Sequence, residues 1–479
     1  MAMNPNSKVI IVGAGVFGLS TALRLSKRGY RNIHIFDRQP YHNNGYSFLQ
    51  GADAASADEN KILRASYADR IQYQNLAFEA MAEWQKWNEK LAATAPEDLP
   101  PGLSPETVLW HQSGYLRLSD HHGLEESERE TQENFPPEIK HTQYRVTDEQ
   151  RRADAKKDGI PASKIDPFGR LDRGLPMDGI LDMTAGFLLA SRACSFALHL
   201  CQNAGVLVSL GPERALESLV QDETKVTGIK TADGTRHSAD LVIVACGGWT
   251  PSILPQVEDL LETTSGSVLS LQLPNDRQDL WDKYSPELFP VWDWNMGGGY
   301  VPYQNVGGIY GFPRTPEGVI KIAFRGAKWT NYSREGSTGQ PLSYPKTDAK
   351  KVPREAMRVT RAFCAENMPD LLALDLEYER LCWYTDSVNN SFLIDYVPGT
   401  EGLMVASGGS GHGFKFLPVL GEHVVDVIER KDTEYTRLFQ WRDVPEGKRN
   451  GLEEGPEGWR RLDKQKMAGK GQWKATSKL

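Results

Sequence analysis

The sequence predicts an α/β fold combined with an α+β part: a Rossmann-like dinucleotide-binding domain and a second domain built on a mostly antiparallel sheet. Three observations predict this arrangement. A short apolar strand, a glycine-rich turn, a helix and a second strand follow one another within residues 8–37. Two more apolar strands, at 240–245 and 403–406, also end in glycine-rich turns, as strands beside a nucleotide site often do. Strand candidates between 268 and 324 lie outside these units and indicate a separate sheet.

Length and composition restrict the classes of protein. A chain of 479 residues has room for two or three domains with a large core. Its hydrophobic content of 39% and charged content of 25% are typical of a soluble globular enzyme, and a net charge of −8 argues against nucleic acid as a partner. No apolar run reaches the length of a membrane span, and residues 1–7 do not resemble a signal peptide. Five cysteines without a CxxC pair fit a reducing compartment, so neither a disulfide framework nor a metal site is expected.

Residues 8–37 carry the dinucleotide fingerprint in its full context. Gly13, Gly15 and Gly18 follow the first strand in G-x-G-x-x-G spacing, and Asp37 ends the second strand. The first glycine permits the tight turn, the second lets the backbone approach a pyrophosphate, and the third lets helix and strand pack closely. The helix N-terminus offers free N–H groups to the phosphates, and Asp37 can accept a ribose hydroxyl. The predicted cofactor-binding residues of this region are Gly13, Gly15, Val16, Phe17, Gly18, Asp37 and Ser56.

The other elements follow from periodicity and turn residues. The long helix over 70–91 has aromatic residues at helical spacing, which favours a core-facing side. The charge run at 125–133 favours a solvated helix face. The remaining predicted elements are a strand over 110–118, a helix over 186–203, a strand at 206–208, a hairpin around Asp233-Gly234, strands at 268–273, 300–301, 308–312 and 319–324, a helix over 352–364 and a helix over 417–429.

These elements suggest a discontinuous organisation. We expect residues 1–95, 179–265 and 370–430 to form the dinucleotide domain, 96–178 and 266–369 the second domain, and 431–479 a C-terminal extension.

The extension is basic, with Gly469 and Gly471 expected to loosen it, and it carries Ser477-Lys478-Leu479, the peroxisomal address. The sequence therefore predicts a peroxisomal protein with the import receptor as a partner, and that location suits an enzyme that makes peroxide. No feature of the sequence indicates an oligomeric state, and a monomer is the simplest expectation.

Four motifs together resemble the sarcosine oxidase and fungal amadoriase (fructosyl amino acid oxidase) family of flavoenzymes, within the D-amino-acid-oxidase-like fold. The first is the fingerprint, and the resemblance covers most of residues 8–430. The second is Cys382-Trp383-Tyr384-Thr385-Asp386. In this family a cysteine in that setting forms a thioether to the flavin 8α-methyl, so the resemblance implies FAD held covalently by Cys382. The other reading is a buried structural cysteine.

The third motif is Ser410-Gly411-His412-Gly413-Phe414-Lys415. The resemblance implies that Lys415 contacts the substrate carboxylate and that His412 is structural or adjacent to the flavin; a surface lysine is the alternative. The glycines let backbone approach the flavin, and a following helix N-terminus can stabilise negative charge there. The residues of this motif expected at the cofactor are Gly411, His412, Gly413, Phe414 and Lys415.

The fourth motif pairs Tyr310 with Lys321, eleven residues later. The resemblance implies that Lys321 activates oxygen and that Tyr310 lines the substrate pocket. Lys321 lies in an apolar strand, where a charge needs an explanation, although a solvent-facing lysine is the alternative.

A weaker fifth element contains Lys61 and Arg64, whose spacing of three suggests one helical face. Both are expected at the substrate, and Lys61 also at the cofactor; the alternative is a solvated basic face. Arg64 suits a carboxylate because its guanidinium can bind it bidentately.

Departures from the family pattern concern the substrate. Ala57-Asp58 stand where sarcosine oxidases carry a histidine, Arg325 replaces a second histidine and becomes a substrate-binding candidate, and Gly409 stands where amadoriases usually have aspartate. The chain looks closer to saccharopine oxidase and fungal biosynthetic amine oxidases. Trp292, Trp294 and Tyr300 either line an aromatic pocket or belong to the core.

The resulting hypothesis is an FAD-dependent oxidase of a secondary amine, such as an N-substituted amino acid. Hydride would pass from the carbon next to nitrogen to flavin N5, giving an imine, and O2 would be reduced to H2O2. No protein base is assigned. The alternatives are a fructosyl amino acid oxidase, a dehydrogenase that uses another acceptor, and a flavin-bearing binding or redox-sensing protein without turnover. The identity of the amine is left open.

Overall fold

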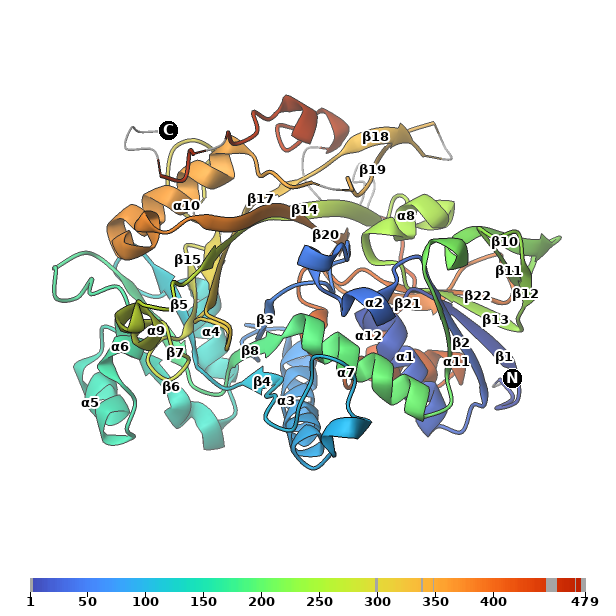
Figure 1. Ribbon diagram of the computed structural model, residues 1–479, viewed down its shortest axis with the longest axis horizontal. Coiled ribbons are helices and arrows are strands. Elements are labelled where there is room, and N and C mark those ends of the chain that lie inside the picture. The colour runs from blue at the N-terminus through green and yellow to red at the C-terminus, as the bar shows by residue number, and fades with distance from the viewer. Residues whose placement is uncertain are drawn as a thin grey trace.

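A computed structural model describes residues 3–297, 300–336, 339–347, 349–444, 455–469 and 471–474. Two sheets dominate it, one on each side of the molecule (Figure 1). Within the described residues, no helix combines the length and the apolar composition that crossing a membrane requires.

The first sheet is the dinucleotide-binding part. Its six strands run in the order β21-β22-β13-β1-β2-β9, all parallel except β21. Their bounds are β1 Lys8–Val12, β2 Asn32–Asp37, β9 Leu207–Leu210, β13 Leu241–Val244, β21 Leu393–Tyr396 and β22 Leu403–Ser407. Apolar strands such as Val-Ile-Ile-Val form here because both faces of a parallel sheet are covered. The Rossmann-like prediction is confirmed.

Helices cover one face of this sheet and a small antiparallel sheet lies near the other (Figure 1). α1 Val16–Lys27 packs between α7 Ala190–Asn203 and α11 Leu420–Ile428, and α3 Ile71–Ala92 buries its tryptophans in the same core. The small sheet consists of β10 Leu216–Asp222, β11 Lys225–Thr231 and β12 Arg236–Ser238, the last two forming the predicted hairpin.

The second sheet has eight strands in the order β20-β14-β17-β16-β15-β5-β7-β6. Every neighbouring pair is antiparallel except β15 with β5, so a mostly antiparallel second domain is confirmed. The strands are β5 Tyr115–Ser119, β6 Gln143–Arg145, β7 Asp178–Asp182, β14 Leu261–Gln272, β15 Val291–Trp294, β16 Ile309–Gly311, β17 Val319–Trp329 and β20 Leu376–Ser387.

Side chains alternate between the two faces of this sheet. One face packs into a core with α10 Arg354–Asn367, and Ile320, Ile322 and Phe324 point into that core. Lys321 and Arg325, which alternate with these residues along β17, therefore point to the opposite face, toward the first sheet.

Short elements complete the fold. A three-stranded sheet of β3 Asn60–Leu63, β8 Gly186–Leu189 and β4 Trp110–His111 lies between the two large ones, and β18 Tyr332–Glu335 pairs with β19 Pro341–Ser343. The remaining α-helices are α2 Tyr41–Asn44, α4 Glu126–Asn134, α5 Glu149–Lys157, α6 Ala162–Ile165, α8 Thr250–Ile253, α9 Gln278–Lys283 and α12 Glu434–Phe439.

Several sequence-based assignments are corrected. Lys61 lies in strand β3, not on a helix, because β3 pairs with β8. The predicted helix over 186–203 is β8 followed by α7, and the strand over 110–118 is divided at Gly114, whose φ is +84°. No strand forms at 300–301.

The domain boundaries remain a prediction, but the membership of three strands differs from it. β7 lies almost entirely within 179–265, yet it pairs with β5 and β6 in the second sheet. β20 lies within 370–430, yet it pairs along β14 in the second sheet. β14 itself starts at Leu261, before the expected boundary at 265.

The C-terminal extension packs against the second sheet where it is described. Leu462, Ala468 and Trp473 enter the core beside α10, and Arg460 lies 3.5 Å from Glu262. The loose tail expected from its basic composition is wrong for these residues, because the apolar residues between the charges anchor the segment. Ser477-Lys478-Leu479 lies outside the described residues.

Candidate functional site

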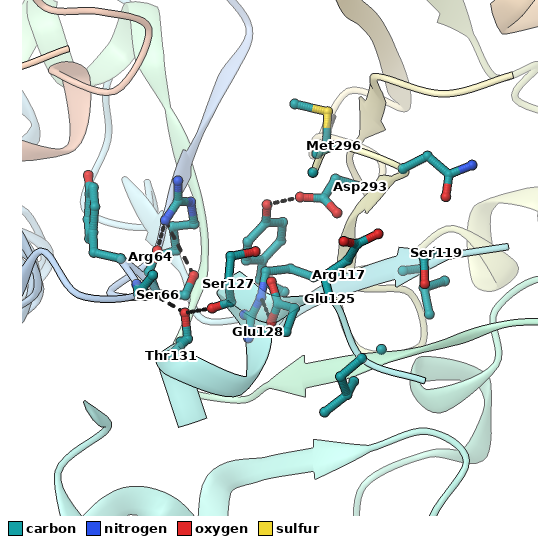
Figure 2. A pocket seen from close by; sticks show the side chains of 18 of the residues that line it. Arg64, Ser66, Arg117, Ser119, Glu125, Ser127, Glu128, Thr131, Asp293 and Met296 are labelled. Atoms are coloured by element: carbon teal, nitrogen blue, oxygen red, sulfur yellow. Dashed lines mark hydrogen bonds and ion pairs between the residues drawn. The ribbon is translucent and has the colours of Figure 1, made fainter. Parts of the chain in front are cut away.

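A cavity of about 870 Å³ separates the two large sheets. It extends from the turn after β1 to the inner face of the second sheet, and its volume falls within the range of about 300–1,000 Å³ common for ligand and cofactor sites. An outer chamber of about 400 Å³ adjoins it (Figure 2). The residues shared by the two are Arg64, Tyr115, Asp293, Met296, Arg325, Lys328 and His412.

The turn between β1 and α1 forms one end of the cavity. A Cβ atom at Gly13, whose φ is +113°, would lie 2.3 Å from the Ala245 carbonyl oxygen, and one at Gly18 would lie 1.8 Å from the Gly13 oxygen. The Asp37 carboxylate accepts the backbone N–H of Ala14 at 2.7 Å, which fixes it beside the turn. Burial raises the pKa of Asp37. Close backbone packing, a helix N-terminus and a positioned carboxylate together fit a dinucleotide.

Nearly all residues predicted to bind the cofactor line this cavity. Gly18 does not; it packs beneath the turn. Ser56 accepts the backbone N–H of Val16 at 3.2 Å and so connects the loop before β3 to the start of α1. The predicted residues that line the cavity are Gly13, Gly15, Val16, Phe17, Asp37, Ser56, Lys61, Cys382, Gly411, His412, Gly413, Phe414 and Lys415.

Lys415 lines the cavity and is 3% exposed. Its ammonium donates to the Tyr67 hydroxyl at 2.8 Å and is 3.4 Å from the His412 carbonyl oxygen, both neutral groups. Burial, together with the charges of Arg64 and Arg325, holds the pKa of Lys415 well below its usual value. An anion entering the cavity would relieve this repulsion.

Arg64 and Arg325 surround the same space. The Arg64 guanidinium donates to the Ser66 carbonyl and lies 4.7 Å from the Tyr67 ring centre. Arg325 donates to the Ser410 carbonyl at 3.2 Å. With Lys415 they form a group of three basic side chains, here called the anion site, whose hydrogen bonds within the described residues go to neutral groups.

Lys321 is buried and does not line the cavity. Its ammonium lies 2.9 Å from Asp58 Oδ2 and donates to the Asn60 carbonyl at 2.5 Å. Burial lowers the pKa of Lys321 to about 8, with Asp58 opposing the shift. The expectation that this lysine is special is consistent with its burial, but its nearest charged partner is a carboxylate of the protein itself.

Asp58 is the centre of a buried group that we call the Asp58 cluster. Besides Lys321, it contacts Lys61 at 2.6 Å and Arg380 at 3.2 Å. Burial opposes ionisation, yet these three cations hold the pKa of Asp58 well below its usual value. In the sequence, Asp58 was noted only as a departure from a family pattern. Its role as the carboxylate shared by three buried cations was not predicted.

Cys382 lies in β20 opposite Gly266, next to the Asp58 cluster. Burial opposes the charge on Arg380, but Cys382 and Asp58 raise the pKa of that guanidinium. Cysteine chemistry requires the thiolate form. Burial raises the pKa of Cys194 to about 12, and Cys194 does not line the cavity.

Tyr310 also lines the cavity, and its cross-strand neighbour in β15 is Asp293. Burial raises the pKa of Tyr310. Trp292 and Trp294, on either side of Asp293, are core residues: both are almost fully buried, and their rings pack on Phe363 with centroids 4.7 and 5.5 Å away. The aromatic-pocket alternative is therefore wrong for the two tryptophans, while the aspartate between them, which the sequence reading missed, faces the cavity.

Comparison with known proteins agrees with this geometry. The profile of the family described as "DAO: FAD dependent oxidoreductase" matches residues 8–427. The chain is 25% identical over 465 residues to the L-saccharopine oxidase of Schizosaccharomyces pombe, covering 91% of this chain and 93% of that protein. It is 24% identical over 434 residues to the peroxisomal sarcosine oxidase of Homo sapiens, covering 89% and 93%. The solved structure of the fructosamine oxidase Amadoriase II from Aspergillus fumigatus, in complex with FSA, has a TM-score of 0.74 at 23% identity and covers 98% of both chains, which shows the fold.

Proposed function

This chain belongs to the family of FAD dependent oxidoreductases, and we propose that it oxidises a secondary amine that carries a carboxylate. The anion site supports this assignment most strongly, because three basic side chains with neutral partners surround one space in the cavity. A buried cation is stabilised by an anionic partner, and a substrate carboxylate would supply it. The names of the relatives, saccharopine oxidase and sarcosine oxidase, refer to secondary amines with carboxylates.

The cofactor would lie between the turn after β1 and Cys382. Gly13, Gly15 and the N-terminus of α1 would hold the phosphates, and Asp37 a ribose hydroxyl. Bound FAD would supply the redox chemistry, as the acceptor of a hydride from the carbon next to the amine nitrogen and the donor of electrons to O2, so that an imine and H2O2 would be the products.

The protein's own residues would bind and orient the substrate. Lys415 and Arg64 would hold the carboxylate, with Arg325 as a third cation. Tyr310 would form the wall beside the reacting carbon. The net positive charge of the Asp58 cluster, including Lys321, would stabilise negative charge that develops in the cavity.

We propose further that Cys382 is the point of covalent FAD attachment. Its place in the cavity wall and its cationic neighbours support this. FAD that stays with the denatured polypeptide, and is lost in Cys382→Ser, is the expected result.

The function is tested by oxygen-dependent peroxide release from the purified protein. A suitable panel contains N-methyl amino acids, saccharopine, pipecolate and a fructosyl amino acid. We expect peroxide from an N-substituted amino acid. Turnover of the fructosyl compound alone would reassign the chain as an amadoriase. Reduction of FAD by the substrate without release of peroxide would indicate a dehydrogenase. Binding of the substrate without any turnover would contradict both the oxidase and the dehydrogenase assignments.

Peroxisomal location is part of the proposal. The tripeptide Ser477-Lys478-Leu479 and the name of the human relative support it. A fluorescent protein fused to the N-terminus should mark peroxisomes, and deletion of the tripeptide should disperse it. A signal unchanged by the deletion would contradict this part of the proposal.

A further inference from the structure

An acidic side chain, Asp293, lies at the junction of the cavity and the outer chamber. It occupies the third position of β15, whose sequence is Val-Trp-Asp-Trp. Since side chains alternate along a strand, the tryptophans enter the core while Asp293 points to the cavity face, beside Tyr310. The residue is 7% exposed, so its carboxylate is largely removed from bulk water.

The partners of Asp293 distinguish it from the other acids of the outer chamber. Glu128 contacts Arg117 at 2.7 Å, and Asp178 contacts Arg145 at 2.6 Å. Within the described residues, the carboxylate of Asp293 has a single hydrogen bond, donated to its Oδ2 by the neutral Tyr115 hydroxyl. None of the described residues donates a hydrogen bond to the second carboxylate oxygen, Oδ1. Burial raises the pKa of Asp293 to about 7, and Glu128 adds to the shift, while the Tyr115 hydrogen bond and the charges of Arg117 and Arg64 oppose it.

Opposite charges thus border one connected space. Figure 2 shows Arg64 on one wall of the outer chamber and Asp293 on the other. Arg64 belongs to the anion site, which includes Lys415 and Arg325. A ligand that spans the two walls would meet cations at one end and a carboxylate at the other.

We propose that Asp293 binds a second, cationic group of the substrate, a protonated amine separate from the nitrogen that is oxidised. This inference rests on the proposed function, since it takes the anion site as the anchor for the substrate carboxylate. A protonated amine would give the buried carboxylate a charged hydrogen-bond donor, whereas an apolar substituent would displace water from it without supplying a donor. Asp293 would therefore select for diamino compounds in addition to binding them.

The experiment uses the FAD-loaded protein and simple ligands instead of an unknown substrate. Butanoate, hexanoate and octanoate are compared with the same acids bearing a terminal amine, and Kd is read from the absorbance of bound FAD. At one chain length, the amino acid form should bind about tenfold or more tightly than the plain acid, as expected for a charge-assisted hydrogen bond in a secluded site.

Asp293→Asn should abolish this preference and leave the Kd of the plain acids within a few-fold. Glu125→Gln is the matched control, because Glu125 lines the same chamber and the same charge is removed, but its side chain is 36% exposed and pairs with His121. The control should keep the preference. If Asp293→Asn does not fold, Tyr115→Phe, which removes the hydrogen bond that orients the carboxylate, should reduce the preference.

Three negative results are possible, and they differ in meaning. Binding of plain acids and amino acids with equal Kd at every length would overturn the role of Asp293 and leave the proposed function intact. No binding of any carboxylate would remove the anchor, and with it both the inference and the proposed substrate class. A preference that survives in Asp293→Asn would also overturn the inference.

Discussion

The Asp58 cluster and the anion site are two groups of buried cations in the same region, yet they are neutralised differently. In the cluster, Lys61, Lys321 and Arg380 surround a carboxylate that the chain supplies itself. In the anion site, Lys415, Arg64 and Arg325 have neutral partners within the described residues. The first arrangement stabilises the fold in the absence of any ligand, whereas the second reaches its lowest energy only when an anion enters. Mutation of one residue in each group should separate these roles.

The largest effect is expected for Asp58→Asn. Removing the shared carboxylate leaves three cations in a buried space, and breaking a buried ion pair in this way costs about 3–5 kcal/mol of folding free energy. Urea unfolding measures the loss. The equivalent change in the anion site, Lys415→Met, should not lower the free energy of unfolding, and a loss of similar size there would erase the contrast between the two groups.

The stability that the Asp58 cluster contributes should also depend on pH. Because the cations hold the pKa of Asp58 below its unfolded value, its stabilising contribution is present at neutral pH and is lost as the pH falls below about 4. The wild-type protein should therefore lose stability in acid more steeply than Asp58→Asn. Parallel stability curves from unfolding at several pH values would show that the cluster does not contribute in this way.

The affinity for a ligand should respond more strongly to a mutation in the anion site than to one in the Asp58 cluster. Lys415→Met removes a buried, charged hydrogen-bond donor, so the Kd for a carboxylate ligand and the KM for substrate should rise about thirtyfold to a thousandfold, or 2–4 kcal/mol. Titration of bound FAD with hexanoate gives the first quantity. Lys86→Met, at an exposed site, is the control. Unchanged affinity in Lys415→Met would place the carboxylate elsewhere.

A smaller effect is the pH dependence of that affinity. The pKa of Lys415 is well below its usual value in the free protein, and a bound carboxylate would raise it, so binding takes up a proton. Above the lowered pKa, Kd should increase about tenfold per pH unit, equal to about 1.4 kcal/mol. The dependence should vanish in Lys415→Met. A flat profile for the wild-type protein would mean that the lysine keeps its charge when the site is free.

The sequence predicted the dinucleotide end of the cavity well, because the turn, the helix and Asp37 lie within 30 residues of one another and obey local rules. It also indicated that Lys321 is unusual. It could not show the partner of Lys321, since Asp58 lies 263 residues away in the chain and only the fold brings the two together.

Short segments were the main source of error. Residues 60–63 and 186–189 have no periodicity long enough to distinguish strand from helix, and their mutual pairing decides the outcome. Asp293 could have been found by the argument applied to Lys321, since both are charged residues in apolar strands. The prediction considered the neighbouring tryptophans instead, and these lie on the core face of β15, whereas Asp293 lies on the cavity face.

The order of strands in the first sheet also constrains the biosynthesis of the protein. β1 and β13 come early and midway in the chain, but β22, which pairs with β13, ends at Ser407, and Lys415 follows it. A ribosome adds about 5–20 residues per second, so at least about 20 seconds separate the synthesis of β1 from the synthesis of β22 and Lys415, which complete the cavity. Nascent chains that stop before β22 should retain no FAD, and cofactor loading would follow translation of nearly the whole chain.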